Sequence, residues 1–279
     1  GGGSGHEPAH GGYVGTGMLD AAVAGAVFTS PTPDPIYEGI KAIATDKGVL
    51  MVIKNYTGDV MNFEMAGEMA QMDDIKVAQV VVDDDVAVDG SLYTVGRRGV
   101  AGTVFVHKIA GAKAEQGAEL EEVQRVAQKV IDNVRTMGVA IRPCTVPAAG
   151  KPGFELGEDE MEVGIGIHGE PGTHKEPLRP ADEIVDHILD KILSDIDYTG
   201  HEVAVMVNSS GATPLMELFI INNHVADVLA AKGIRVYKTY VGEYMTSLEM
   251  EGFSVSLLRL DDELKALLDA HADTIAFKA

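Results

Sequence analysis

Residues 49–82, VLMVIKNYTGDVMNFEMAGEMAQMDDIKVAQVVV, predict a buried strand, a helix and a second strand in succession. The apolar run at residues 49–55 is typical of a strand buried on both faces, and residues 76–82 repeat the pattern. Between them, residues 60–74 favour a helix. Strands that alternate with helices indicate parallel sheets whose two faces are covered by helices. The stretch therefore places the chain in the α/β class.

The same alternation extends along most of the chain. Apolar residues repeat at intervals of three and four over residues 118–138, which predicts a long helix. Further helices and strands are expected at residues 181–196, 202–208, 214–233 and 234–242. Ligands of such sheets bind at the carboxyl ends of the strands. We therefore expect mostly parallel sheets, with a substrate cleft at the C-terminal ends of their strands.

One stretch interrupts the alternation and predicts a domain boundary. Residues 144–160, CTVPAAGKPGFELGEDE, are rich in proline and glycine and show no helical period. We therefore expect two α/β domains, at residues 1–143 and 144–279.

Composition favours an acidic globular protein. Of the 279 residues, 46% are apolar and 23% charged, and 43 acidic against 22 basic residues give a net charge of −21. This charge disfavours nucleic acid and anionic membranes as partners. No apolar run approaches the roughly 18 residues of a membrane span, and no signal peptide is visible, so we expect a cytoplasmic protein. The single cysteine, Cys144, disfavours disulfides and cysteine-rich zinc sites, and we assign it no role.

The opening stretch GGGSGHEPAHGG (residues 1–12) resembles a zinc-protease motif in sequence but not in expected structure, and it does not match a Walker phosphate loop. HEPAH fits the zinc-protease pattern HExxH, but Pro8 and the flanking glycines disfavour the helix that this pattern needs. The stretch lacks the lysine of a Walker phosphate loop. Residues 164–169 match the dinucleotide pattern GxGxxG, yet Gly172 disfavours the helix that should follow. We therefore expect neither metal nor nucleotide on these loops.

Two glycine-rich loops share a histidine close to a Glu-Pro pair. They are SGHEPAHGG, which contains His6, and GIHGEPGTH, which contains His168. Each follows glycine-rich or apolar sequence that would end at the carboxyl edge of a sheet, so both histidines could enter one cleft. A single loop of this kind is more often a turn whose histidine caps backbone groups. Two of them favour a functional site.

A third loop follows the strand predicted at residues 49–55. Its Asp59 is either a helix N-cap or a functional carboxylate. Lys54 lies at the end of an apolar run, and a buried lysine needs a partner or a ligand. Two histidines, a carboxylate and a lysine suit a small polar substrate with a carbonyl or hydroxyl group.

Four long motifs resemble those of the K subunits of dihydroxyacetone kinases. They are GGGSGHEPAHGGYVGTGMLDAAVAGAVFTSP (1–31), KNYTGDVMNFEMA (54–66), GRRGVAGTVFVHKIAGA (96–112) and EVGIGIHGEPG (162–172). The resemblance extends in order over nearly the whole chain. A family member would normally carry a further N-terminal segment, which we expect to be missing here.

The resemblance implies covalent substrate binding. It makes His168 the residue that bonds to the ketone carbon of dihydroxyacetone as a hemiaminal. Asp59 and His6 would serve the hydroxyl group that receives phosphate, with Asp59 preferred as the base. The substrate pocket would be lined by these three residues together with Gly3, Ser4, Gly5 and Lys54.

The resemblance also implies cofactors and partners. This subunit would hold no nucleotide and no metal, whereas a separate L subunit would carry ADP or ATP with Mg²⁺ and be recharged by a phosphotransferase-system phosphocarrier. The K subunit of such a phosphoenolpyruvate-dependent dihydroxyacetone kinase is expected to be a homodimer. Two alternatives stay open: a non-catalytic, dihydroxyacetone-binding paralogue that co-activates a transcription regulator, and an ATP-dependent single-chain kinase cut before its L domain. Arg97 and Arg98 would serve either a turn or a partner contact.

Overall fold

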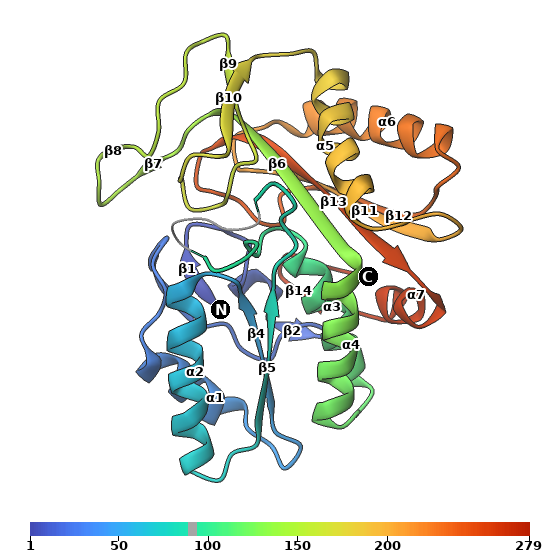
Figure 1. Cartoon of the computed structure of the whole chain (residues 1–279). Coiled ribbons are helices and arrows are strands. Elements are labelled where there is room, and N and C mark those ends of the chain that lie inside the picture. Colours follow the sequence, from blue (N-terminus) through green and yellow to red (C-terminus); the bar gives the residue numbers. More distant parts are fainter. Residues whose placement is uncertain (89–93) are drawn as a thin grey trace.

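The N-terminal part of the molecule is built around two pairs of parallel strands. A computed structural model describes residues 1–88 and 94–279 (Figure 1). Each pair joins strands that are separated in sequence, namely β1 (Gly2–Ser4) with β3 (Ala24–Val27), and β4 (Val49–Lys54) with β5 (Val77–Val82). The helices of this part are α1 (Pro33–Ile43), α2 (Thr57–Met72), α3 (Thr103–Glu115) and α4 (Leu120–Asn133).

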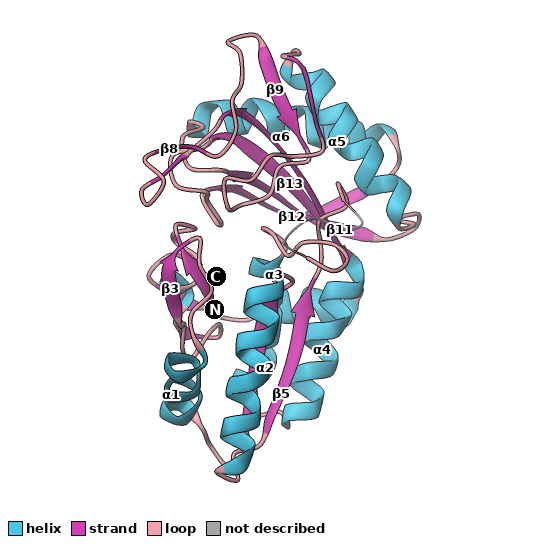
Figure 2. Ribbon diagram, turned by 60° about the vertical axis from the view of Figure 1, so that its left-hand side comes forward, coloured by secondary structure: helices cyan, strands magenta, loops and turns pink. Residues whose placement is uncertain are grey.

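The C-terminal part contains a six-stranded sheet. Its strands, in order across the sheet, are β10 (His174–Pro177), β9 (Glu160–Val163), β6 (Val134–Arg142), β13 (Glu251–Leu260), β11 (Glu202–Ser209) and β12 (Arg235–Gly242). The helices of this part are α5 (Ala181–Asp195), α6 (Leu215–Ala231) and α7 (Asp262–Asp269). Figure 2 shows α5 and α6 along one side of the sheet.

Short elements complete the fold. A single 3-10 turn, η1 (Gly11–Tyr13), is followed by β2 (Gly15–Thr16), which pairs with β14 (Asp273–Thr274) near the C-terminus. The strands β7 (Thr145–Val146) and β8 (Lys151–Pro152) form a small hairpin. The β2–β14 pair therefore fastens the last residues of the chain beside the glycine-rich opening loop.

The α/β class is confirmed, but the strand directions of the large sheet differ from the expected ones. Only β11 and β12 are parallel there, whereas every other neighbouring pair is antiparallel. The expectation failed because four of the six strands, β6, β9, β10 and β13, were not predicted as strands, and every antiparallel pair contains at least one of these four. A strand buried on both faces has the same continuous apolar pattern in either direction. Adjacent residues of β11 show this burial, since Val205 belongs to the core under α5 and α6 and Met206 to the core on the opposite face.

One predicted helix is too long. Residues 118–138 were expected to be helical, but α4 ends at Asn133 and β6 begins at Val134. The run from Val134 to Ile141 spaces its apolar residues in a way that fits either a helix or a strand, so the spacing alone did not locate the change. The strand β6 precedes the expected domain boundary and pairs with β13, which follows it. The six-stranded sheet thus crosses that boundary, and the division at residue 143 stays a prediction.

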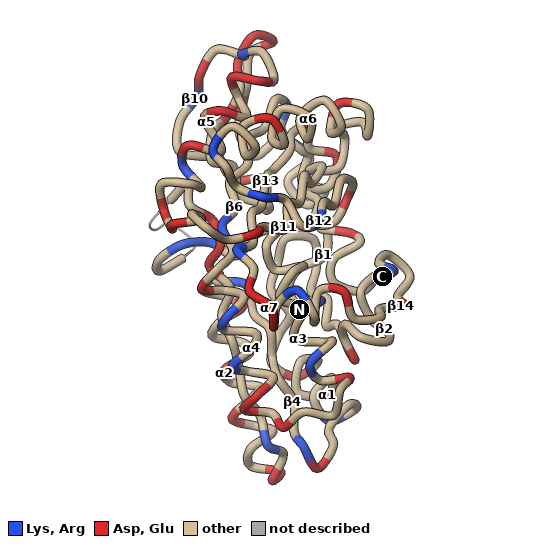
Figure 3. The backbone as a smooth tube through the Cα atoms, turned by 90° about the vertical axis from the view of Figure 1, so that its right-hand side faces the viewer, with Lys and Arg blue, Asp and Glu red and all other residues tan. Residues whose placement is uncertain are grey.

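Acidic residues are distributed along both parts of the molecule and outnumber the basic ones (Figure 3). Within the described parts of the chain, no helix is long and apolar enough to cross a bilayer.

Candidate active site

The glycine-rich opening loop places His6 beyond the end of β1. Gly3 has no room for a side chain, because a Cβ atom there would lie 2.6 Å from the backbone nitrogen of Thr29. Ser4 donates its hydroxyl hydrogen to the carbonyl oxygen of Gly25 at 2.7 Å, which fixes β1 on β3. Gly5 then turns the chain with a φ of +99°, a conformation that favours glycine. These residues shape the loop that presents His6.

His6 is fully buried and its tautomer is defined by its partner. Its Nδ1 atom lies 2.9 Å from the carbonyl oxygen of Thr246. A carbonyl oxygen only accepts, so Nδ1 carries the hydrogen and Nε2 is left with a free lone pair. Burial, reinforced by the charge of Lys54, lowers the pKa of His6 well below its ordinary value. His6 therefore presents an unprotonated nitrogen at neutral pH.

His168 lies on the loop that follows β9, against the ring of His6. The two ring centroids are 4.7 Å apart in an edge-on arrangement, and the ring of Tyr56 lies 4.2 Å away. The backbone N–H of His168 donates to the carboxylate of Glu170 at 2.7 Å. Burial, reinforced by the positive charge of Lys54, lowers the pKa of His168 well below its ordinary value. The two predicted histidines thus meet, as neutral imidazoles.

Lys54 and Asp59 reach the same place from the end of β4 and the first turn of α2. Both are buried. A Cβ atom at Gly2 would lie 3.2 Å from Lys54 Nζ and 3.7 Å from an Asp59 carboxylate oxygen, so both side chains face the backbone of β1. Burial lowers the pKa of Lys54 to about 8, against the opposing charge of Asp59. The N-cap of α2 is Tyr56, so Asp59 is not the cap of its helix.

His6, Lys54, Asp59, His168 and the neighbouring Tyr56 each have a buried polar atom without a hydrogen-bond partner in the described residues. Residues 1–88 and 94–279 contain twelve such side-chain atoms, and five of them belong to these residues. Buried polar groups are almost always paired, because leaving one unpaired costs about 1–3 kcal/mol. The unpaired atoms are His6 Nε2, Lys54 Nζ, Tyr56 Oη, Asp59 Oδ1 and His168 Nδ1. Their convergence indicates a site for a small polar ligand.

Comparison with known proteins identifies the family. The model of the Dak1 domain matches residues 1–276. The chain belongs to the Dak1 domain family. A relative from Listeria innocua, the PTS-dependent dihydroxyacetone kinase 1, dihydroxyacetone-binding subunit DhaK, is 59% identical over 279 residues, which cover 99% of this chain and 85% of the relative.

Two solved structures share the fold of this Dak1 chain. The dihydroxyacetone kinase operon co-activator Dha-DhaQ superposes with a TM-score of 0.93 at 38% identity, covering 99% of this chain and 85% of the co-activator. The native form of the dihydroxyacetone kinase of C. freundii gives 0.92 at 36% identity, covering 99% of this chain and 50% of the kinase. A kinase and a co-activator therefore share the backbone of this Dak1 chain.

The structure adds two aromatic residues to the candidate site of this Dak1 domain. Tyr56 packs edge-on against His168, and Phe28 stacks on His6 with centroids 5.2 Å apart. Tyr56 lies between Lys54 and Asp59 in sequence, so its position at a strand end was a usable signal. Phe28 lies in the same motif as His6 (residues 1–31), but its short apolar segment did not mark it as a site residue.

The two adjacent arginines of this Dak1 domain differ in environment. Arg98 is buried and pairs with Asp85 at 2.7 Å, so it has a structural role. Arg97 is partly exposed and forms two hydrogen bonds to Asp195, at 2.6 and 2.9 Å. A partner contact of Arg97 stays a prediction.

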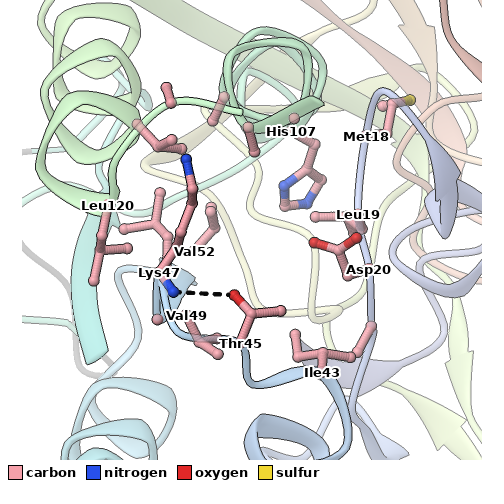
Figure 4. Close-up of a pocket in the computed structure, with 18 residues that line it drawn as sticks. Met18, Leu19, Asp20, Ile43, Thr45, Lys47, Val49, Val52, His107 and Leu120 are labelled. Atoms are coloured by element: carbon pink, nitrogen blue, oxygen red, sulfur yellow. Dashed lines mark hydrogen bonds between the residues drawn. The ribbon is translucent and has the colours of Figure 1, made fainter. Parts of the chain in front are cut away.

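One large cavity is lined by residues other than the four predicted side chains His6, Lys54, Asp59 and His168 (Figure 4). It has a volume of about 500 Å³ and is lined mainly by apolar side chains of β4, α3 and the segment before β3, with Asp20, Lys47 and His107 as its titratable groups. His107 connects it to the opening loop through a 2.9 Å hydrogen bond with His10. In the described residues no cluster of three or more histidine, cysteine, aspartate or glutamate side chains is arranged for a metal. The convergent unpaired atoms, rather than this cavity, mark the candidate active site of this Dak1 domain.

Proposed function

We propose that this chain is the substrate-binding, catalytic subunit of a phosphoenolpyruvate-dependent dihydroxyacetone kinase, and that it captures dihydroxyacetone covalently on His168. The observation that carries the proposal is the convergence of unpaired buried atoms from His6, Lys54, Asp59 and His168. A three-carbon ketone with two hydroxyl groups would supply partners for these atoms. The printed name of the Listeria relative, a dihydroxyacetone-binding subunit, supports the same substrate.

The capture step uses the neutral state of His168. The lone pair of its unprotonated ring nitrogen forms a bond to the ketone carbon, and the π electrons of the C=O bond move to the oxygen. That oxygen gains a proton while the imidazole loses its N–H proton, so a neutral hemiaminal results. Glycerol has no carbonyl carbon to attack, so this bond selects the ketone more sharply than hydrogen bonds alone would.

The transfer step requires a base near the terminal hydroxyl group. Once the ketone carbon is bonded to His168, a terminal hydroxyl group is held in place, and phosphoryl transfer depends mainly on such positioning. Asp59 is the proposed base, assisted by the free lone pair on His6 Nε2. The positive charge of Lys54 would stabilise the negative charge that develops on the oxygens. Gly3, Ser4 and Gly5 are proposed to line the pocket at the end of β1.

The phosphate donor is proposed to be a separate L subunit. That subunit would carry ADP or ATP with Mg²⁺ and receive phosphate from a phosphotransferase-system phosphocarrier, and the K subunit would be a homodimer in the cytoplasm. A second candidate function, co-activation of a transcription regulator after dihydroxyacetone binding, is supported by the co-activator of the same fold at 38% identity.

Reconstitution with an L subunit separates the two candidates. A mixture of this chain, an L subunit, the phosphocarriers and phosphoenolpyruvate is expected to yield dihydroxyacetone phosphate. Asp59→Asn should lower kcat by about 10²–10⁴-fold, the range for loss of a general base. Glu68→Gln, the same chemical change at an exposed position of α2, should leave kcat unchanged. Covalent binding without phosphorylation in the complete mixture would reject the kinase and favour the co-activator.

A further inference from the structure

Arg98 is a buried side chain with three partners on two segments of the chain. It is 1% exposed. Its Nε atom donates to Asp85 at 2.7 Å, and its Nη2 atom donates to the carbonyl oxygen of Gly164 at 2.6 Å. Its Nη1 atom lies 3.5 Å from the carboxylate of Glu170. The planar guanidinium thus joins the end of β5 to the loop that carries His168.

Glu170 holds the other end of that loop. One of its carboxylate oxygens accepts the backbone N–H of His168 at 2.7 Å, and the other faces Arg98. The fit against the loop is close, since a Cβ atom at Gly166 would lie 1.8 Å from Glu170 Oε1 and 2.9 Å from Arg98 Nη1. The Arg98–Glu170 pair therefore fixes both the carbonyl group of Gly164 and the N–H of His168.

The pair is anchored on the same sheet edge as Lys54. Asp85 follows β5, which runs parallel to β4 with Lys54 opposite Val82. The backbone N–H of Asp85 also donates to the carbonyl oxygen of Arg98 at 3.1 Å. Neither Arg98 nor Glu170 contacts the imidazole of His168 through a hydrogen bond, so any effect on the ring passes through the backbone.

Resting on the proposed function, we propose that Arg98 and Glu170 are positioning residues that hold the His168 loop in register with Lys54 and Asp59 for attack on the ketone. Burying an ion pair rarely adds stability over an apolar pair of the same size. Its fixed geometry, however, sets the distance between segments, and a displacement of about 1 Å in a reacting group costs roughly 100-fold in rate.

The test compares Glu170→Ala with Glu170→Gln. Glutamine keeps an oxygen that accepts the His168 N–H, whereas alanine removes it. With dihydroxyacetone labelled with carbon-13 at C2, we expect the affinity for the tetrahedral adduct to fall at least about tenfold in Glu170→Ala. Glu170→Gln, whose amide nitrogen would face Arg98, should weaken the affinity less than Glu170→Ala does. The control is Asp197→Ala, which removes an exposed carboxylate that accepts the backbone N–H of Thr199 between α5 and β11.

A readout without substrate separates this proposal from the proposed function. In the free protein, the ring signals of His168 should be shifted by the rings of His6 and Tyr56, and Glu170→Ala should move them toward those of a free imidazole. Adduct formation and ring signals that match the wild type in Glu170→Ala would overturn the positioning role. If wild-type protein forms no adduct, the proposed function fails, and the ring signals still decide the positioning role.

A second variant serves if Glu170→Ala does not fold. Arg98→Lys keeps the charge but cannot reach Asp85, Gly164 and Glu170 at once, because an ammonium group lacks the guanidinium fork. We expect folded Arg98→Lys with at least about tenfold weaker adduct formation and displaced His168 signals. Wild-type adduct formation in this variant would contradict the proposal.

Discussion

Two groups of buried charged and polar side chains lie beside one another, and they differ in whether their atoms are paired. The arginine cluster, defined as Arg98, Asp85 and Glu170, has each charged group bonded to a neighbour. The reactive cluster, defined as His6, Lys54, Asp59 and His168, leaves a buried polar atom of each residue without a partner in the described residues. The two clusters meet at the backbone of His168.

The difference shows how the molecule separates support from chemistry. A paired buried charge is held in one geometry by its partners. An unpaired buried polar group costs stability until a ligand supplies the partner. We infer that the arginine cluster fixes the position of the His168 loop, while the unpaired polar atoms of the reactive cluster are available for hydrogen bonds to the substrate. Variants of the two clusters should therefore have opposite effects on stability.

The largest stability effect is expected from breaking the arginine cluster. Arg98→Met leaves Asp85 and Glu170 buried without their cation, so the free energy of unfolding should fall by about 3–5 kcal/mol. Urea unfolding followed by circular dichroism measures the change. The control Arg142→Met, at an exposed ion pair with Glu251, should change stability by less than about 0.5 kcal/mol. If Arg98→Met and Arg142→Met lowered the free energy of unfolding equally, the buried arginine cluster would stabilise the fold no more than an exposed ion pair does.

The next effect is a pH dependence from the reactive cluster. Burial lowers the pKa of His6 below its ordinary value of 6.5, so below that pH the unfolded chain binds a proton that the folded chain does not. Stability should therefore fall with falling pH, by at most about 1.4 kcal/mol per pH unit for this residue. In His6→Phe this contribution is lost, and urea midpoints between pH 7 and pH 5 should decline less steeply. The exposed His201→Phe should keep the wild-type slope, and a wild-type slope in His6→Phe would refute the assignment.

The smallest expected effect is an increase, not a decrease, in the free energy of unfolding. Lys54→Met removes a buried cation whose pKa is lowered to about 8 by desolvation, so the free energy of unfolding should rise by about 1 kcal/mol while dihydroxyacetone binding weakens. The loss of its attraction to Asp59 offsets part of the gain. Thermal unfolding and the adduct assay on the same samples measure both. A clear loss of stability would show that Lys54 is a structural residue and remove the contrast between the clusters.

The residues of the reactive cluster were predicted from the sequence more successfully than the strand directions of the six-stranded sheet. Glycine-rich loops around His6 and His168, and a lysine at the end of an apolar run, are local patterns, and the structure brings these residues together. The direction of β13 depends on pairing between segments more than a hundred residues apart, which no local pattern encodes. Helix and strand spacings coincide near Val134, so the end of α4 was missed.

The arginine cluster was invisible in the sequence for a similar reason. Arg98 lies in a glycine-rich segment where exposed turn residues are common, and its burial depends on Asp85 and Glu170. Glu170 was noted only as part of a Glu-Pro pair. A buried charge is identified by its surroundings, which the fold creates.

The proposed function depends above all on the capture of the ketone by neutral His168. The most direct measurement is a carbon-13 spectrum of dihydroxyacetone labelled at C2, recorded with the wild-type chain and with His168→Ala. We expect a protein-bound tetrahedral signal, distinct from that of the free hydrate, that is present with the wild type and absent with the variant. A folded wild-type chain that leaves the free spectrum unchanged, or a bound tetrahedral signal that persists in His168→Ala, would contradict the proposed capture on His168.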